Sequence, residues 1–260
     1  MRRIALILVG AALLALLPVS VLGCNITCAC ASTPDPNWTP PPIGAEEAAI
    51  YAAKAAGVPL MSAQLVVGLS GRSLYQATAA DAVAIVDAES GMVLEVVLTD
   101  LMPNDATASV AAVDAQTSAE AFVHRAGLTT EGFTVSVRTT RQGGIAAHEV
   151  AWNEPTKFEA FVNASTGAVF AFVDLRMQLN LTAPLIGRDR ATQLAIAALG
   201  VPGETVTSAD LTIDFTASDS QVSTWSVGLG VPSATQADVY EFGGLVSVDA
   251  VTGQTTIVKS

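Results

Sequence analysis

Few residues in this chain combine the type and spacing that metal chemistry requires. His148 and Glu149 are adjacent, but Trp152 holds the position at which the metalloprotease pattern H-E-x-x-H needs its second His. His148 also alternates with Val150 and Trp152 as in a strand, whereas that pattern requires a helix. His124 lies in a helical pattern and is the only other His. We therefore predict two structural histidines, no metal and no zinc site.

Other catalytic patterns are also missing. Gly68-Leu69-Ser70-Gly71 does not have the spacing of the G-x-S-x-G nucleophile elbow. Gly228-Leu229-Gly230 does not open a helix as a dinucleotide-binding G-x-G-x-x-G would, and we expect it in a loop. Trp152, Trp225 and Tyr240 are expected in the core. The sequence predicts no catalytic residue, no cofactor and no enzymatic activity.

The N-terminus has the pattern of a secretory signal. Arg2 and Arg3 precede an uncharged stretch from Ile4 to Leu17, which is shorter than the ~20 residues that a membrane-spanning helix needs. Val21-Leu22-Gly23-Cys24 follows and resembles the lipobox of bacterial lipoproteins. The resemblance implies removal of residues 1–23 and a lipid on Cys24 that anchors the chain outside the cytoplasm, at the cell surface or the periplasmic face of a membrane. The alternative is an ordinary signal peptide cut near Gly23.

Residues 24–44 are predicted to form a tether. The segment from Ser32 to Ile43, STPDPNWTPPPI, is rich in Pro and has no hydrophobic period, which favours an extended spacer. Cys28 and Cys30 could form a strained bridge, link two molecules or stay free. We favour free thiols in the tether, because the chain has only 3 Cys and all of them lie here.

The charge of the chain argues against a nucleic-acid partner. Lys and Arg number 12 against 24 Asp and Glu, so the formal net charge is −12. Binding to a polyanion needs a cluster of basic residues, and no stretch of this sequence has one. The acidity favours solubility at an exposed surface.

The pattern V-[DN]-A-x-[ST]-G occurs three times, each time between two β-type runs. A turn of this kind needs an Asx residue that bonds its own backbone and a Gly with positive φ, so each copy predicts a β-hairpin. One side-chain oxygen per turn is too few for calcium. The structural turn residues are Asp87, Gly91, Asn163, Gly167, Asp249 and Gly253.

A short helical pattern ended by Gly precedes each hairpin. The first runs from Glu46 to Gly57, the second from the capping-box sequence Thr117-Ser118-Ala119-Glu120 to Gly127, and the third from Ala191 to Gly200. We therefore predict an α+β protein of three tandem small units, each a helix packed on an antiparallel sheet. The units are residues 45–100, 117–176 and 187–260, with linkers 101–116 and 177–186 and an insertion at Ser218 to Gln236 in the third.

Helix, strands and V-D-A-x-T-G hairpin together resemble the PepSY domain. The resemblance covers nearly all of the chain after the tether and implies a cystatin-like helix on a sheet and a role in controlling peptidases. Because no protease domain follows, such control would act on a separate protein. We expect a non-catalytic binding or regulatory module whose partner is a peptidase or another envelope protein. The alternatives are an exported hydrolase with an unrecognised site and a structural surface spacer.

Overall fold

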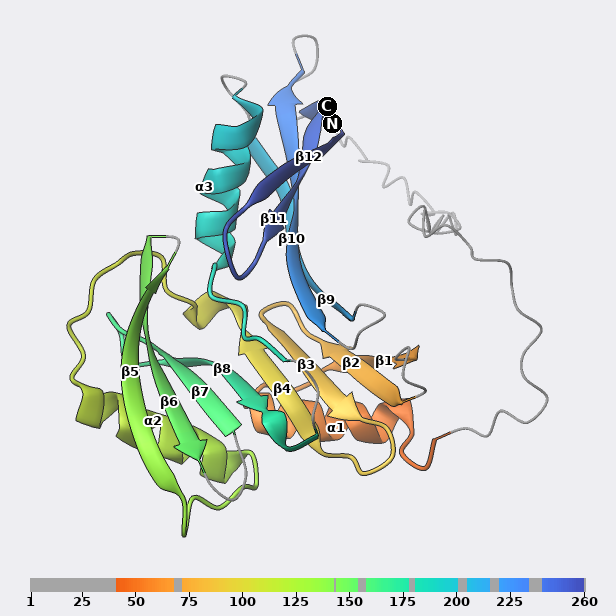
Figure 1. The fold of residues 1–260 in the computed structure, drawn as a ribbon. Helices are drawn as coiled ribbons and strands as arrows, with labels where there is room; N and C mark the ends of the chain where they lie inside the picture. The colour runs from red at the N-terminus through yellow and green to blue at the C-terminus, as the bar shows by residue number, and fades with distance from the viewer. Residues whose placement is uncertain are drawn as a thin grey trace, which may run out of the picture. The chain divides into compact units, whose positions relative to one another are not determined.

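The computed structural model describes residues 41–67, 72–142, 144–153, 158–177, 181–200, 205–215, 220–233 and 240–259 (Figure 1). The expected signal segment, Cys24, Cys28, Cys30, nearly all of the tether and Ser70 lie outside these residues. The described chain is α+β, with large antiparallel sheets and three α-helices. None of the described helices is both long enough and apolar enough to cross a bilayer.

One order of elements, a helix followed by four strands, recurs along the chain. The first set is α1 (Ala45–Ala56), β1 (Ser62–Val67), β2 (Ser73–Thr78), β3 (Ala82–Asp87) and β4 (Val93–Leu98), with a 3-10 turn at Thr99–Leu101. The second is α2 (Ala112–Arg125), β5 (Thr134–Gln142), β6 (Ile145–Asn153), β7 (Phe158–Asn163) and β8 (Val169–Asp174), with a 3-10 turn at Leu175–Met177. The third is α3 (Arg188–Leu199), β9 (Thr205–Phe215), β10 (Gln221–Pro232), β11 (Tyr240–Asp249) and β12 (Thr255–Lys259).

The strands form two sheets, whereas the sequence analysis expects one sheet in each of three units. β1 to β8 form one sheet in the order β1-β2-β3-β4-β8-β7-β6-β5, and the other has the order β12-β11-β10-β9. β4 pairs antiparallel with β8, with Glu95 opposite Val173 and Val97 opposite Ala171. Nearly every residue of β4 and β8 is buried, so a free edge on either strand would expose unpaired backbone groups beside apolar side chains. Joining the two strands removes both edges.

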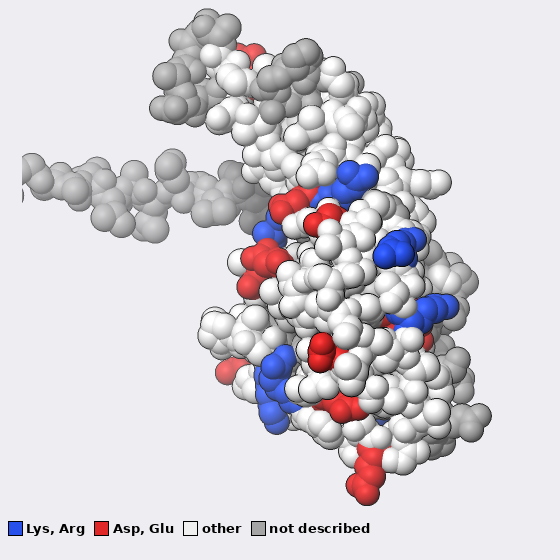
Figure 2. Space-filling view, turned by 90° about the vertical axis from the view of Figure 1, so that its left-hand side faces the viewer, with Lys and Arg blue, Asp and Glu red and all other residues white. Residues whose placement is uncertain are grey.

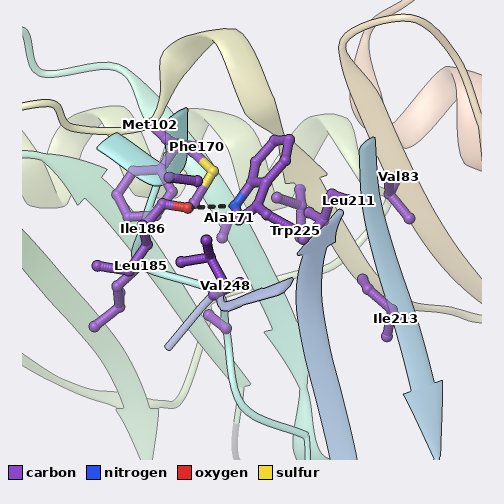
Figure 3. Packing of buried hydrophobic residues seen from close by; sticks show 14 of the residues in the cluster. Val83, Met102, Phe170, Ala171, Leu185, Ile186, Leu211, Ile213, Trp225 and Val248 are labelled. Atoms are coloured by element: carbon purple, nitrogen blue, oxygen red, sulfur yellow. Dashed lines mark hydrogen bonds between the residues drawn. The ribbon is translucent and has the colours of Figure 1, made fainter. Parts of the chain in front are cut away.

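The larger sheet is apolar on both faces. One face packs with α1 and α2 in a cluster that includes Val86, Val96 and Phe172. The other face contributes Val83, Phe170 and Ala171 to a second cluster. Trp225 of the smaller sheet is fully buried in this cluster (Figure 3). The indole Nε1 of Trp225 donates to the backbone oxygen of Ile186 at 2.7 Å, which satisfies its polar atom in the core.

Two expected boundaries are wrong. α2 begins at Ala112 and Ala111 is its N-cap, so the linker expected at 101–116 contains the first helical turn. Thr117 lies inside the helix, where its hydroxyl donates to the backbone oxygen of Val113 at 3.0 Å and does not form a capping box.

The segment expected as an insertion, 218–236, instead contains β10, a strand of 12 residues. Gly228 and Gly230 lie in this strand and not in a loop. A Cβ at Gly228 would lie 2.7 Å from Oγ of Ser208 on β9, so a larger residue there would require this hydroxyl to move.

Candidate functional site

The Asx side chains of the three repeated turns bond within the turns, and Nδ2 of Asn163 also donates to the backbone oxygen of Leu101 at 3.1 Å. The Gly N–H donates to the backbone oxygen of the Asx residue four positions earlier, at 2.8 to 2.9 Å in all three turns. The Asx side chains accept further bonds from the turn backbone or hydroxyl groups. The φ angles of Gly91, Gly167 and Gly253 are 73°, 77° and 76°, in the left-handed region. These residues shape the backbone, and Oδ1 of Asp87 is buried without a hydrogen-bond partner among the described residues.

The two histidines are not placed for metal binding. His148 is 3% exposed, and its Nε2 donates to the backbone oxygen of Val110 at 2.9 Å while Nδ1 lies 2.9 Å from Oγ1 of Thr139. His124 is exposed on α2, 3.4 Å from the hydroxyl of Thr130. In the part of the chain that the structure describes, no three His, Cys, Asp or Glu residues are grouped so that they could hold a metal.

The three large aromatic residues have different environments. Trp152 and Trp225 are buried, as the sequence analysis expects. Tyr240 is 50% exposed, so the expectation of a core position for this residue is wrong. It is the first residue of β11 and pairs with Pro232, the last residue of β10, at one end of the smaller sheet.

An apolar hollow of about 580 Å³ lies between α1 and β1. We call it the α1/β1 groove. Ala49, Ala53 and Ala63 form part of its wall, and Ile50 and Leu60 lie along it with 60% and 77% of their surfaces exposed. The groove is thus a concave apolar surface next to large apolar side chains that the described chain leaves exposed, a combination typical of binding sites.

Alanine residues leave the groove empty, as the second helix and its first strand demonstrate. Counting back through the strand pairs from Asp87 and Asn163, Ala63 on β1 corresponds to Val137 on β5. The ring of Phe133 packs edge-on against that of Phe158 with their centroids 5.1 Å apart. The methyl group of Ala63 fills less space beside β1 than the side chain of Val137 fills beside β5. Sequence analysis missed this site, because the correspondence of Ala63 with Val137 depends on the strand register and left no signal in the sequence.

The groove borders the outer edge of β1, with which no described strand pairs. The sequence of β1, SAQLVV, has no charged residue. The other end of the same sheet is β5, which carries Arg138 and Arg141. Arg138 forms an ion pair with Glu149 on β6. Charged side chains protect an edge strand against pairing with another chain, so β5 is protected and β1 is open to it.

Charges occur near both ends of the groove. Glu46 lies in the first turn of α1 and Lys54 in its last turn, and both line the groove. Eight helical residues separate them by about 12 Å along the axis. Elsewhere, acidic and basic groups are interspersed among uncharged ones, and the face in Figure 2 has no continuous basic patch. That face therefore lacks the surface that a nucleic acid would need.

Glu95 is the one residue with a large pKa shift among the described carboxylates. It is fully buried on β4, where Nε2 of Gln221 on β10 donates to Oε1 at 3.0 Å, and Oε2 has no partner among the described residues. Burial raises the pKa of Glu95 to about 8, which the bond from Gln221 only partly offsets. Glu95 thus joins the two sheets as a neutral acid at pH 7, and it is inaccessible to a substrate.

No protein-family model and no curated protein matches this chain. Among solved structures, the chain is similar to the Bacillus megaterium YpeB C-terminal domain. The TM-score is 0.40 at 12% identity, over 84% of this chain and 99% of the other. A likeness this distant assigns no function.

Proposed function

We propose that this chain is a non-catalytic binding module that takes up an extended segment of a partner protein along β1 and the α1/β1 groove. One observation carries the proposal: an uncharged edge strand lies directly beside an apolar hollow with two large exposed apolar residues. An edge of this kind supplies backbone hydrogen bonds to an added strand, and the adjacent hollow supplies a place for its side chains.

The geometry of strand addition defines the chemistry of the segment. Side chains of an added strand alternate between the two faces of the sheet, so every second one would point towards α1. Ala63 and Leu65, which are half-buried on β1 and pack with the α1 cluster, mark that face. The segment therefore has apolar residues at alternate positions, and these occupy the hollow beside Ile50 and Leu60.

The charges at the groove add a direction. A basic residue of the segment would be favoured beside Glu46 and an acidic one beside Lys54. Both groups are solvent-exposed, so they select an orientation more than they add affinity. Peptidases, which handle extended chains, are among the partners we propose, because the sequence pattern resembles that of PepSY domains.

We also propose export and lipid anchoring at Cys24, because Val21-Leu22-Gly23-Cys24 has the lipobox pattern. A Pro-rich tether would then hold the module away from the bilayer. Cys24→Ala should release the chain from membranes or leave its signal uncleaved. Intact-mass measurement of the membrane-bound wild type should find acyl groups on the mature N-terminus, and a mature chain without them would refute the anchor.

Selection of displayed random linear peptides of about ten residues, the length of a long strand, against the full chain tests the binding function. Selected peptides should bind an Ala63→Phe variant at least about tenfold more weakly, because the added ring fills the groove that Ala63 lines. Ser136→Phe adds the same ring to the exposed face of β5 and should leave the affinity unchanged. Peptides that ignore Ala63→Phe, or a selection that yields none, would favour a structural spacer.

A further inference from the structure

A second hollow, of about 390 Å³, lies between the last turns of α1 and α2 and the turn before β4. Lys54, Arg125 and Arg176 line it, and no Asp or Glu of the described residues does. We call it the cationic hollow. In a chain with twice as many acidic as basic residues, three cations around one space without an acid in its wall need an explanation.

The three cations differ in how they are satisfied. Arg176 is paired, because Nε and Nη2 both donate to the fully buried carboxylate of Asp174. Lys54 and Arg125 have no hydrogen-bond acceptor among the described residues. The guanidinium of Arg125 lies 4.8 Å from the ring centroid of Phe122, which holds it over an aromatic face without using its N–H groups.

Arg125 and Lys54 lie at the same end of α1. A Cβ at Gly57, the C-cap of α1, would lie 3.6 Å from Nε of Arg125, so this side chain of α2 reaches the end of the other helix. Lys54 is in the last turn of α1. Two cations from different helices therefore face one space.

Nearby negative charge balances only part of this positive charge. Asp174 offsets Arg176, and each of the two helix C-termini contributes roughly −0.5 charge. Glu47 accepts a bond from Tyr51, which lines the hollow, but its own carboxylate is not part of the wall. Lys54 and Arg125 thus leave an excess of roughly one positive charge, which suits a single anion.

We infer that the cationic hollow is a binding site for a small oxyanion, a carboxylate or a phosphate group. The planar guanidinium of Arg125 presents paired N–H donors that match two oxygens of such a group, and Lys54 supplies a point charge from the other helix. Ser90 and Met92, on the turn before β4, form the opposite wall and make the space bounded. The site does not depend on a partner strand at β1.

Titration of the full ¹⁵N-labelled chain with acetate and with inorganic phosphate, each at constant ionic strength set by chloride, tests the site. The signals to follow are Nε–H of Arg125 and the backbone amides of Gly57 and Gly127. Saturable shifts with acetate alone or phosphate alone identify the preferred oxyanion, and saturable shifts with both leave it a general oxyanion site. Shifts that do not saturate, or that chloride reproduces, overturn the inference.

Variants locate the binding. Arg125→Gln should weaken the preferred anion about tenfold or more, because a charge-assisted pair of hydrogen bonds is lost. Lys54→Gln should also weaken anion binding. Because Lys54 does not pack on Phe122, this second variant shows that the loss does not come from disturbed packing around Arg125. Arg141→Gln, an exposed arginine on β5, is the matched control and should bind as the wild type does. Equal binding by all three variants contradicts the inference.

Discussion

The two halves of the eight-stranded sheet have the same order of elements but differ in how they are closed. The first half, α1 with β1 to β4, ends in an uncharged edge beside an apolar groove. The second, α2 with β5 to β8, ends in an edge that carries Arg138 and Arg141, and Phe133 packs beneath it. The difference shows that a few side chains decide whether the same arrangement of helix and strands leaves an edge strand open to pairing or protects it. We therefore propose the first half as the one that takes up a partner strand.

The halves differ also where they meet. Counting four residues from Gly91 and Gly167, Glu95 on β4 corresponds to Ala171 on β8. Both face the cluster formed with the smaller sheet, but only Glu95 brings an ionisable group into it. The first half thus carries the pH-sensitive contact between the sheets.

The largest expected effect is that of Glu95→Gln on stability at high pH. The folded pKa of Glu95 is raised from 4.5 to about 8, so the unfolded chain releases this proton first as the pH rises. Stability is therefore lost between about pH 4.5 and pH 8, by about 5 kcal/mol at most, and stays low above that. Gln keeps the bond with Gln221 but cannot ionise, so the variant should be the more stable form at pH 9.

Urea unfolding of both proteins at pH 5 and pH 9 measures this contribution. The difference between variant and wild type isolates Glu95 from the other titrating groups. We expect nearly equal stabilities at pH 5. A difference that does not change with pH would show that Glu95 is not buried as a neutral acid.

An aromatic ring removed from the second half and one added to the first should have unequal effects on stability. Phe133→Ala removes the ring that packs against Phe158 and should destabilise the protein by about 2–3 kcal/mol, less than for a fully buried Phe because this side chain is half-buried. Ala63→Phe adds a ring to an existing hollow and should change stability by less than about 1 kcal/mol. Thermal unfolding of the two variants checks this, and equal losses would mean that the hollow at Ala63 is not a real difference.

The repeated turns should also tolerate substitution unequally. Gly91 and Gly167 both have positive φ, so Ala at either should destabilise by roughly 1 kcal/mol. At Gly91 the new Cβ would lie 2.7 Å from the ring of Tyr51, whereas at Gly167 it would make an ordinary 3.6 Å contact with Val110. Gly91→Ala should therefore lower the melting temperature more than Gly167→Ala, and the opposite order would contradict this packing against α1.

The smallest expected effect on stability is that of a charge on either edge. Gln64→Lys and Ser136→Lys change exposed residues of β1 and β5 and should each alter stability by less than about 0.5 kcal/mol. Only Gln64→Lys should weaken the binding of selected peptides, because it gives β1 a charged side chain of the kind that protects the β5 edge from pairing. Equal weakening by both would place the peptide outside the β1 edge.

Local chemistry explains which elements the sequence could indicate. The glycines after Asp87, Asn163 and Asp249 have the positive φ that a short Asx turn requires, because such a turn is determined within a few residues. The start of α2 was misplaced by five residues, since Ala111 caps the helix without a side-chain bond and leaves no signature. Thr117 has the type of a cap but lies within the helix.

Non-local packing explains the rest. The residue patterns of β4 and β8 do not predict that the two strands pair, because the paired residues lie more than seventy positions apart in the sequence. The α1/β1 groove depends on the small side chain of Ala63, which only the fold brings beside Ile50 and Leu60. Lys54 and Arg125 are unremarkable on separate helices, and only the fold brings them to one space.

Hydrogen exchange of the full chain with a selected peptide is the most direct test of the account. Strand addition to β1 would give its outward amides new partners, so exchange of residues 62–67 should slow in the presence of the peptide. Exchange in β5, residues 134–142, should stay the same. Protection of β5, β9 or β12 with β1 unchanged would contradict the claim that the first half of the sheet is the open, binding half.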